Sequence, residues 1–227
     1  EKFKRANVYN YGCNFRCPWC SYKLKRESRP QRFLSVQEVK DILQNLDIDR
    51  VHFLGGEPTT CRHLQDLALF AHDVLGVYTK VGHSNGSCPI PEGIDAVSIS
   101  IKTLSNDIHL KYTGQPNTDV LRNFVDAYER GIDVSASSVL IPGLIECDEI
   151  ERIAHFIADI EPKIPSHIIG YIPVPDAPWR GALPEEVEEA KRRAKKYLYN
   201  VTSSSLTVDR YLNLSKYDSR YISTRIA

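Results

Sequence analysis

The sequence predicts an α/β fold with a mainly parallel sheet, arranged as a partial (β/α)6 TIM-type barrel. We expect a single domain over residues 1–227. Strand-like stretches alternate along the chain with stretches of helical periodicity, which is the pattern of successive β/α units. A chain of 227 residues that is 42% hydrophobic is long enough for one substantial core. A doubly wound open sheet is the alternative, and either fold places functional groups at the carboxyl ends of the strands.

Six strands and five helices are expected. The strands are rich in β-branched and aromatic residues, and they cover Asn7–Tyr11, Arg50–Leu54, Tyr78–His83, Ala96–Lys102, Val134–Ile141 and His167–Val174. The helices cover Ser35–Leu46, His63–Leu75, Asp119–Arg130, Glu149–Ile160 and Pro184–Leu198. The first helix begins with Ser35 as its N-cap, and Glu38 completes a capping box there.

The last expected helix has an ordered arrangement of charges. Pro184 suits a helix start, glutamates fill the first turns, and lysines and arginines fill the last. We expect the i,i+4 pairs Glu188–Arg192 and Glu189–Arg193. A solvated helix that stabilises itself explains this pattern, so the charges indicate no partner.

The overall composition narrows the classes of function. Lys+Arg and Asp+Glu both number 29, so net charge indicates neither nucleic acid nor membrane binding. There is no apolar signal region at the start and no run of about 18 apolar residues. We therefore expect a cytoplasmic protein whose six cysteines are reduced thiols rather than a disulfide framework.

Cys13, Cys17 and Cys20 are the most informative residues of the chain. Their gaps of three and two residues gather three thiolates around one point, with no fourth cysteine close by. A structural zinc site normally has four protein ligands, whereas three ligands suit a 4Fe–4S cluster that leaves one iron open. Zinc and a redox dithiol remain the alternatives. The segment resembles the cluster loop of radical S-adenosylmethionine (SAM) enzymes, in which an aromatic residue precedes the last cysteine, here Trp19.

Gly55-Gly56-Glu57-Pro58 follows the second expected strand. Alone, this segment indicates only a tight turn. It resembles the motif with which radical SAM enzymes bind the amino group of SAM. Glycines let backbone carbonyls approach a ligand closely, and Glu57 can accept a charge-assisted bond from an ammonium. The resemblance also places Trp19 beside the adenine, with a plain core aromatic as the alternative.

The resemblance implies a mechanism as well as a site. Cys13, Cys17 and Cys20 would hold three irons, and SAM would chelate the fourth. Reductive cleavage of SAM would then form a 5′-deoxyadenosyl radical that abstracts hydrogen from a substrate. The cofactors carry this chemistry, while the protein positions them.

Further segments are most similar to the glycyl-radical-enzyme activating enzymes, such as the pyruvate formate-lyase activating enzyme. The similarity runs from about Val8 to Tyr171. It is carried by Ile99-Ser100-Ile101-Lys102, Asp107-Ile108-His109, Tyr112-Thr113-Gly114 and Val139-Leu140-Ile141-Pro142-Gly143. The resemblance implies that Lys102 approaches SAM. Ser84, Asn85 and Ser100 are also expected SAM contacts.

The chain departs from that family at three positions. His83 and Ser100 stand where activases have aspartates that help to hold a monovalent cation, so we expect no cation site. Ser137 stands where a basic residue is often found. These departures leave the substrate open. It is a glycyl radical enzyme, another peptide, a cofactor precursor or a small molecule.

Three other features have both a functional and a structural explanation. Cys61, Cys88 and Cys147 are either buried small hydrophobes or auxiliary thiols. The basic stretch 23–32 is either a solvated loop or a docking site for an electron donor such as flavodoxin or ferredoxin. The loop 173–180, with Trp179 and Arg180, either forms a substrate wall for an anionic or planar molecule or covers the barrel end.

Two classes of function follow. The first is a radical SAM enzyme, and the second is a zinc-binding or electron-transfer module without turnover. The Gly-Gly-Glu-Pro turn at residues 55–58 favours the enzyme, because a zinc knuckle does not require such a turn.

Overall fold

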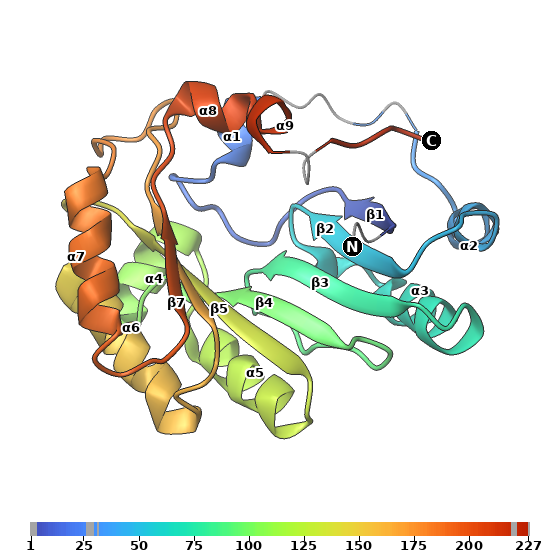
Figure 1. Ribbon diagram of the computed structural model, residues 1–227, viewed down its shortest axis with the longest axis horizontal. Helices are drawn as coiled ribbons and strands as arrows, with labels where there is room; N and C mark the ends of the chain where they lie inside the picture. Colours follow the sequence, from blue (N-terminus) through green and yellow to red (C-terminus); the bar gives the residue numbers. More distant parts are fainter. Residues whose placement is uncertain (1–3, 26–29, 31, 219–221, 227) are drawn as a thin grey trace.

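The structure, a computed structural model, describes residues 4–25, 30, 32–218 and 222–226 (Figure 1). Seven strands form one parallel sheet in the order β1-β2-β3-β4-β5-β6-β7. They are β1 Arg5–Asn10, β2 Arg50–Gly55, β3 Tyr78–Ser84, β4 Ala96–Ser100, β5 Asp133–Leu140, β6 Ser166–Gly170 and β7 Val201–Ser204. Within the described residues β1 and β7 are the two edges, so the sheet does not close. The predicted partial barrel is confirmed. The doubly wound alternative is wrong, because that fold reverses its strand order.

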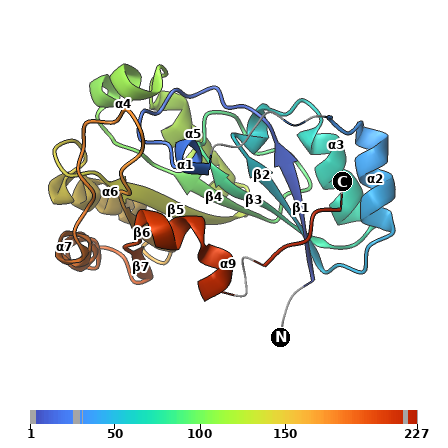
Figure 2. The same ribbon diagram turned by 90° about the horizontal axis from the view of Figure 1, so that it is seen from above.

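Helices follow most of the strands. They are α1 Tyr22–Lys25, α2 Val36–Gln44, α3 Leu64–Leu69, α4 Asn106–Thr113, α5 Thr118–Glu129, α6 Cys147–Ile160, α7 Pro184–Ala194, α8 Val208–Leu212 and α9 Leu214–Tyr217. Figures 1 and 2 show α5 and α6 on one side of the sheet and α1, α8 and α9 on the other. No helix of the described part is both long and apolar enough to span a bilayer.

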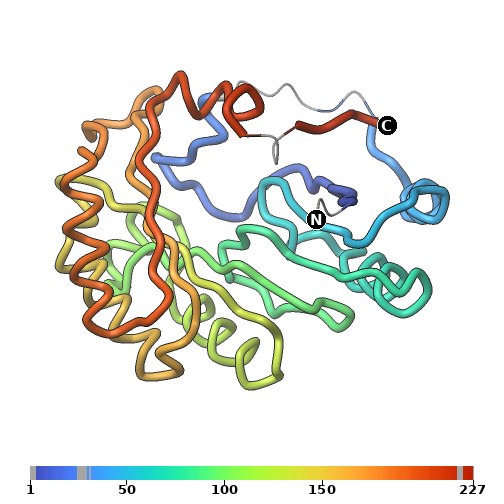
Figure 3. Tube along the Cα trace, viewed as in Figure 1, coloured from blue at the N-terminus to red at the C-terminus, as the bar shows by residue number. Residues whose placement is uncertain are grey.

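The chain after β7 returns to the segment that follows β1, as the trace in Figure 3 shows. The hydroxyl of Tyr211 in α8 donates to Ser21 Oγ at 3.1 Å, just before α1. The C-terminal helices therefore lie on the side of the sheet opposite α5 and α6, against the loop that carries the three clustered cysteines.

The two faces of the sheet differ in chemistry. Buried apolar side chains, among them Val51, Phe53, Val81, Val97 and Ile168, pack in the core with the helices. Because successive side chains of a strand point to opposite faces, the residues between them lie on the other side, which we call the inner face. It carries polar side chains from β1 to β6, namely Asn7, His52, Lys80, Ser98, Ser135 and His167.

Some expected elements were missed or had wrong bounds. The short edge strand β7 was missed because Val-Thr-Ser-Ser has no apolar run. Helix α4 was also missed, although Ser105 caps its start and Gly114, at φ 80°, ends it. Strand β6 ends at Gly170 rather than Val174, and β4 ends at Ser100, before Lys102. The sequence stays largely apolar after β6, through Tyr171, Ile172 and Val174, and Ile101 follows β4, so apolar residues continue beyond the point where strand pairing stops.

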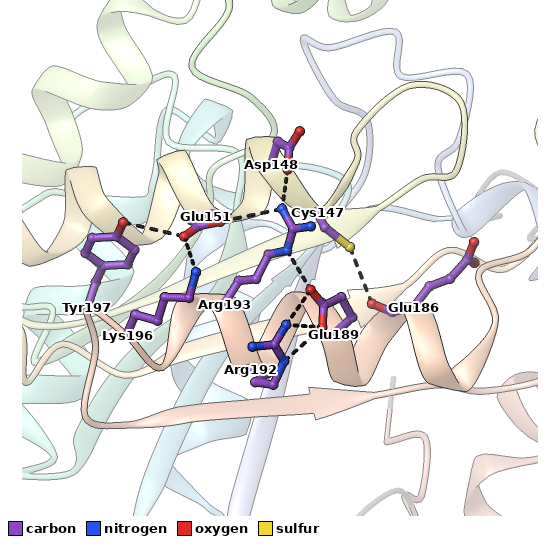
Figure 4. Close-up of polar contacts among 9 residues, drawn as sticks. All are labelled: Cys147, Asp148, Glu151, Glu186, Glu189, Arg192, Arg193, Lys196 and Tyr197. Carbon is purple, nitrogen blue, oxygen red and sulfur yellow. Dashed lines mark hydrogen bonds and ion pairs between the residues drawn. The ribbon is translucent and has the colours of Figure 1, made fainter.

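The charged helix α7 is tied to α6 (Figure 4). Arg193 bonds Glu189 at 2.7 Å as expected, and it also pairs with Asp148 and Glu151 of α6. Lys196 Nζ bonds Glu151 at 2.9 Å. The expected Glu188–Arg192 pair is replaced by Arg192–Glu189 at 2.6 Å. The charges of α7 therefore stabilise that helix and also join it to α6. The expected pairing changed because carboxylates three residues earlier in α7, and those of α6, also bind the arginine side chains.

Candidate functional site

The three clustered cysteines lie on the loop that leaves the carboxyl end of β1. All three are free thiols, with Cys13 exposed and Cys17 and Cys20 half-buried. The backbone N–H of Phe15 donates to Cys13 Sγ at 3.4 Å, and Asn85 Nδ2 donates to the same sulfur at 3.6 Å. Hydrogen bonds to cysteine sulfur are one means by which proteins tune iron–sulfur clusters, so the donor set suits a cluster ligand.

The cysteine loop is held by α4. The backbone N–H of Arg16 donates to the carbonyl of Thr113 at 2.8 Å. The Phe15 ring meets the His109 ring edge-on, with centroids 5.3 Å apart. Gly114 ends α4 at φ 80°, a left-handed conformation that strains other residues, and it packs beside the Arg16 guanidinium. The helix missed in the sequence therefore supports the loop.

The Gly-Gly-Glu-Pro turn packs directly on the start of the cysteine loop. The N–H of Glu57 donates to the carbonyl of Gly12 at 2.8 Å, and the N–H of Gly56 donates to that of Asn10 at 3.2 Å. A Cβ on Gly55 would lie 2.0 Å from the Asn10 carbonyl oxygen, and one on Gly56 would lie 2.0 Å from that of Gly12. Both glycines are thus required by backbone-to-backbone contact between the two loops.

The Glu57 side chain is fully buried and saturated by donors. Its Oε1 accepts from Thr59 N at 3.0 Å, Thr59 Oγ1 at 2.7 Å and Ser84 Oγ at 2.9 Å. Its Oε2 accepts from the backbone N–H of Asn85. A carboxylate has about four lone-pair sites. The side chain therefore joins the turn to the end of β3, rather than facing outward to receive an ammonium, and Pro58 begins the short 3₁₀ turn that follows.

Lys102 lies two residues beyond β4 and faces the cysteine loop. Its Nζ donates to Ser100 Oγ at 3.3 Å and lies 5.8 Å from the centre of the Phe15 ring. Desolvation by the neighbouring protein raises the pKa of the Cys17 thiol and also that of Cys13, although Cys13 as a whole residue is exposed, and the charge of Lys102 acts in the opposite direction on both. Cluster assembly would therefore release protons from these thiols.

Among the described residues no three His, Cys, Asp or Glu side chains are gathered around one ion position. A 4Fe–4S cluster does not need such a point, because its three thiolates bind three separate irons. Cys13, Cys17 and Cys20 with their N–H donors fit that group. These are the residues that could hold a cluster, and Lys102 is the neighbouring positive charge.

Trp19 belongs to an aromatic group. It is 7% exposed, and its ring centroid lies 6.0 Å from Tyr112 and 5.9 Å from Trp179. Trp179 also meets Tyr171 at 6.5 Å. The arrangement matches the alternative of a core aromatic, and it docks the loop 173–180 onto the cysteine loop. Arg180 pairs with Glu186 instead of pointing into a substrate space.

The remaining cysteines are separate from this group. Cys147 donates to the carbonyl of Glu186 at 3.6 Å, between α6 and α7 (Figure 4). Cys88 Sγ contacts Ser87 Oγ at 3.8 Å, and Cys61 ends the 3₁₀ turn after Pro58. In the basic stretch 23–32, residues 26–29 and 31 lie outside the described residues.

Several inner-face residues were not recognised in the sequence. His167 lies beside Ser137 in the β5–β6 register, and His52 lies beside Lys80 in the β2–β3 register. The alternation of His52, Lys80 and His167 with buried apolar residues along each strand was the available signal. His83, already noted as a departure from the activases, lies at the β3 end with φ 52°.

The comparisons with known proteins agree with this site. The sequence profile of the Radical SAM superfamily matches residues 7–157. A putative glycyl-radical enzyme activating enzyme of Methanocaldococcus jannaschii is 28% identical over 209 residues, covering 88% of this chain and 80% of that protein. The pyruvate formate-lyase-activating enzyme of Staphylococcus epidermidis is 24% identical over 224 residues, covering 86% and 88%.

Two solved structures have a similar fold. A domain of the pyruvate-formate lyase-activating enzyme from Bacteroides vulgatus superposes with a TM-score of 0.55 at 21% identity, covering 68% of this chain and 98% of that one. Streptococcus suis SuiB bound to S-adenosylmethionine superposes with a TM-score of 0.67 at 13% identity, covering 97% and 51%. At these identities the likeness concerns the fold alone.

The chain therefore belongs to the radical SAM superfamily, since the profile covers more than half of it. It is an enzyme, and its cofactors are a 4Fe–4S cluster and S-adenosylmethionine. Its relatives by sequence include activating enzymes.

Proposed function

We propose that this enzyme cleaves SAM reductively at a cluster held by Cys13, Cys17 and Cys20, in the manner of a glycyl-radical activase. The bound cluster and SAM together supply a 5′-deoxyadenosyl radical that abstracts a hydrogen atom from the substrate. The observation that carries the proposal is the direct bond from Glu57 N–H to the Gly12 carbonyl. It places the expected SAM-binding turn against the expected cluster loop, as a shared cofactor site requires.

The SAM-binding residues divide into two groups. Gly55 and Gly56 present backbone groups at the carboxyl end of β2, and Ser100 presents a hydroxyl at the end of β4, where it accepts a hydrogen bond from Lys102 Nζ. The remaining expected residues support the carboxyl edge of the sheet instead of contacting SAM. Glu57 holds Ser84 and Asn85 in place by hydrogen bonds, and Pro58 and Trp19 are buried. We propose the first group as the direct SAM contacts.

Reduction of the cluster requires an electron donor. We propose an acidic protein such as flavodoxin or ferredoxin, which would dock on the basic stretch that begins at Lys23. If so, the rate of reduction falls as ionic strength rises, because salt screens complementary charge. A rate that does not change with salt contradicts this docking.

We also propose that residues 1–227 work as one domain in the cytoplasm. One hydrophobic core joins strands from Ala6 in β1 to Val201 in β7. The six free cysteines suit a reducing compartment.

The test is anaerobic reconstitution followed by addition of SAM and dithionite. We expect a brown protein that forms 5′-deoxyadenosine. Cys17→Ala should lose both iron and product, whereas the matched control Cys147→Ala should keep both, because Cys147 lies between α6 and α7. A colourless protein that binds zinc and forms no 5′-deoxyadenosine would contradict the proposal.

A further inference from the structure

Asn85 lies where the end of β3 meets the cysteine loop. It directly follows Ser84, the last residue of β3, and it is 6% exposed. Its amide nitrogen Nδ2 donates to Cys13 Sγ at 3.6 Å, although the two residues are 72 positions apart in the chain. A buried side chain at the end of a strand is therefore directed at the sulfur of the first clustered cysteine.

The hydrogen bonds of the Asn85 side chain fix its orientation. An asparagine amide has two N–H donors on Nδ2 and an acceptor at Oδ1. Oδ1 accepts from the backbone N–H of Ser87 at 2.9 Å, and Nδ2 donates to Asn14 Oδ1 at 2.8 Å as well as to Cys13 Sγ. Because a backbone N–H can only donate, Oδ1 must face Ser87. Nδ2 must consequently face the sulfur.

The backbone at Asn85 is held by other groups. Its N–H donates to Oε2 of the buried Glu57 carboxylate. The carbonyl of the next residue, Gly86, accepts from Nδ2 of Asn123 in α5 at 2.8 Å. These bonds position the turn after β3 without involving a cysteine. The bond from the Asn85 side chain to the sulfur is therefore separate from the bonds that hold the turn.

A hydrogen bond to a ligating sulfur affects the reduction potential of an iron–sulfur cluster. One-electron reduction adds negative charge, and an N–H directed at the sulfur stabilises the more negative state. Cys13 Sγ also accepts from the backbone N–H of Phe15 at 3.4 Å, but that donor belongs to the cysteine loop itself. Among the described residues Asn85 provides the side-chain donor to this sulfur, so a substitution can remove it.

We propose that Asn85 is a positioning residue that raises the reduction potential of the cluster through its hydrogen bond to Cys13. This inference rests on the proposed function, in which Cys13 is a cluster ligand. It gives Asn85 a role different from the SAM contact that the sequence suggested. A higher potential makes reduction by the electron donor more favourable, and reduction precedes the cleavage of SAM in the proposed function.

The test compares Asn85→Leu with Asn123→Leu in the reconstituted holoenzyme. Each variant replaces a buried asparagine by an apolar side chain of similar shape, and each removes a hydrogen bond that supports the turn after β3. The Asn85 variant also removes the donor to the sulfur. The midpoint potential is measured by a redox titration with mediators, without SAM, in which electron paramagnetic resonance reports the reduced cluster.

We expect one-electron reduction of Asn85→Leu to be about threefold to tenfold less favourable than that of the wild type. This change corresponds to a midpoint potential roughly 30–60 mV lower, since a factor of ten is about 59 mV for one electron. Asn123→Leu should keep the wild-type potential, because its sulfur donor remains. A general loosening of the turn would change both variants alike.

Asn85→Asp provides a second measurement in case the leucine variant folds poorly. The carboxylate keeps an acceptor for the Ser87 N–H, but it loses both N–H donors and places negative charge beside Cys13 Sγ. The potential of this variant should fall at least as far as that of Asn85→Leu, because a nearby negative charge opposes reduction.

The outcomes separate this inference from the proposed function. Equal potentials in the wild type and the Asn85 variants, or equal shifts in Asn85→Leu and Asn123→Leu, overturn the inference. Failure of both Asn85 variants to bind iron also overturns it, because Asn85 is then a structural residue. If the wild type binds no iron, or if Cys13→Ala keeps all of it, the proposed function is wrong instead.

Discussion

The carboxylate of Glu57 accepts a hydrogen bond from the hydroxyl of Ser84 at 2.9 Å, between buried groups. The two residues are 27 positions apart in the chain, and each lies at the carboxyl end of a strand, β2 and β3 respectively. This bond joins two strand ends at the edge where the cysteine loop is also anchored. The order of the site therefore depends on a residue that, within the described part of the chain, forms no hydrogen bond with a cysteine sulfur, since the donors to Cys13 Sγ are Phe15 N–H and Asn85 Nδ2.

Glu57→Gln tests this dependence. The amide would place an N–H₂ group among four donors, so at least one buried donor loses its acceptor. We expect the free energy of unfolding to fall by about 2–3 kcal/mol, together with weaker SAM binding in calorimetry. Glu92→Gln, on an exposed turn, is the matched control and should change neither. Full stability of the Glu57 variant would show that the buried carboxylate is not needed.

Gly56→Ala tests the contact between the two loops. The added Cβ would lie 2.0 Å from the Gly12 carbonyl oxygen, so one of the loops must move. We expect a reconstituted protein with less bound iron, measured by chemical analysis. Gly131→Ala is the comparison, because its Cβ meets open space and only its φ of 79° is unfavourable. That variant should lose about 1 kcal/mol of stability and keep its iron. Equal iron in both variants would contradict the steric argument.

The stability of the protein should depend on pH through His52. Its folded pKa is about 4 and its ordinary value is 6.5, so the unfolded chain binds more protons between these values. Stability is therefore complete above about pH 6.5 and falls as the pH drops toward 4. A full shift of this size corresponds to about 3 kcal/mol, and solvent screening of a half-exposed ring reduces it to roughly 1–2 kcal/mol.

Denaturant unfolding at pH 7 and pH 5 measures this dependence. His52→Gln should lose less stability than the wild type over that interval, because its side chain does not titrate. His155→Gln, on the exposed surface of α6, should follow the wild type. If His52→Gln loses as much stability between pH 7 and pH 5 as the wild type does, this histidine is not the source of the pH dependence.

Trp19 and Trp179 are the two tryptophans of the chain, which makes their contact measurable by fluorescence. Trp179→Ala removes the ring that Trp19 meets at 5.9 Å. We expect the emission of Trp19 to shift to longer wavelength as water reaches it, and stability to fall by about 2 kcal/mol, below the value for a fully buried tryptophan. Trp179→Phe keeps an aromatic ring and should preserve the emission maximum. A similar red shift in both variants would contradict this packing.

Much of the fold was predicted from local patterns. The strands from β1 to β6 and the larger helices carry apolar periodicity, and Ser35 with Glu38 forms the expected capping box. β7 and α4 were missed because short or polar elements owe their conformation to neighbours rather than to their own composition. The order of strands in the sheet also had to come from the tertiary structure, because the same alternation of strands and helices is compatible with a doubly wound sheet.

By itself the sequence determined which family the chain resembles, because three cysteines at this spacing and a Gly-Gly-Glu-Pro turn are recognised by residue type and order alone. Tertiary structure decided what each residue does. It placed Glu57 among four donors and showed that Gly55 and Gly56 are required by backbone contact. It also gathered Lys80 and His167 on one face. Those relationships arise from strand register and loop packing between residues distant in the chain, which no local pattern encodes.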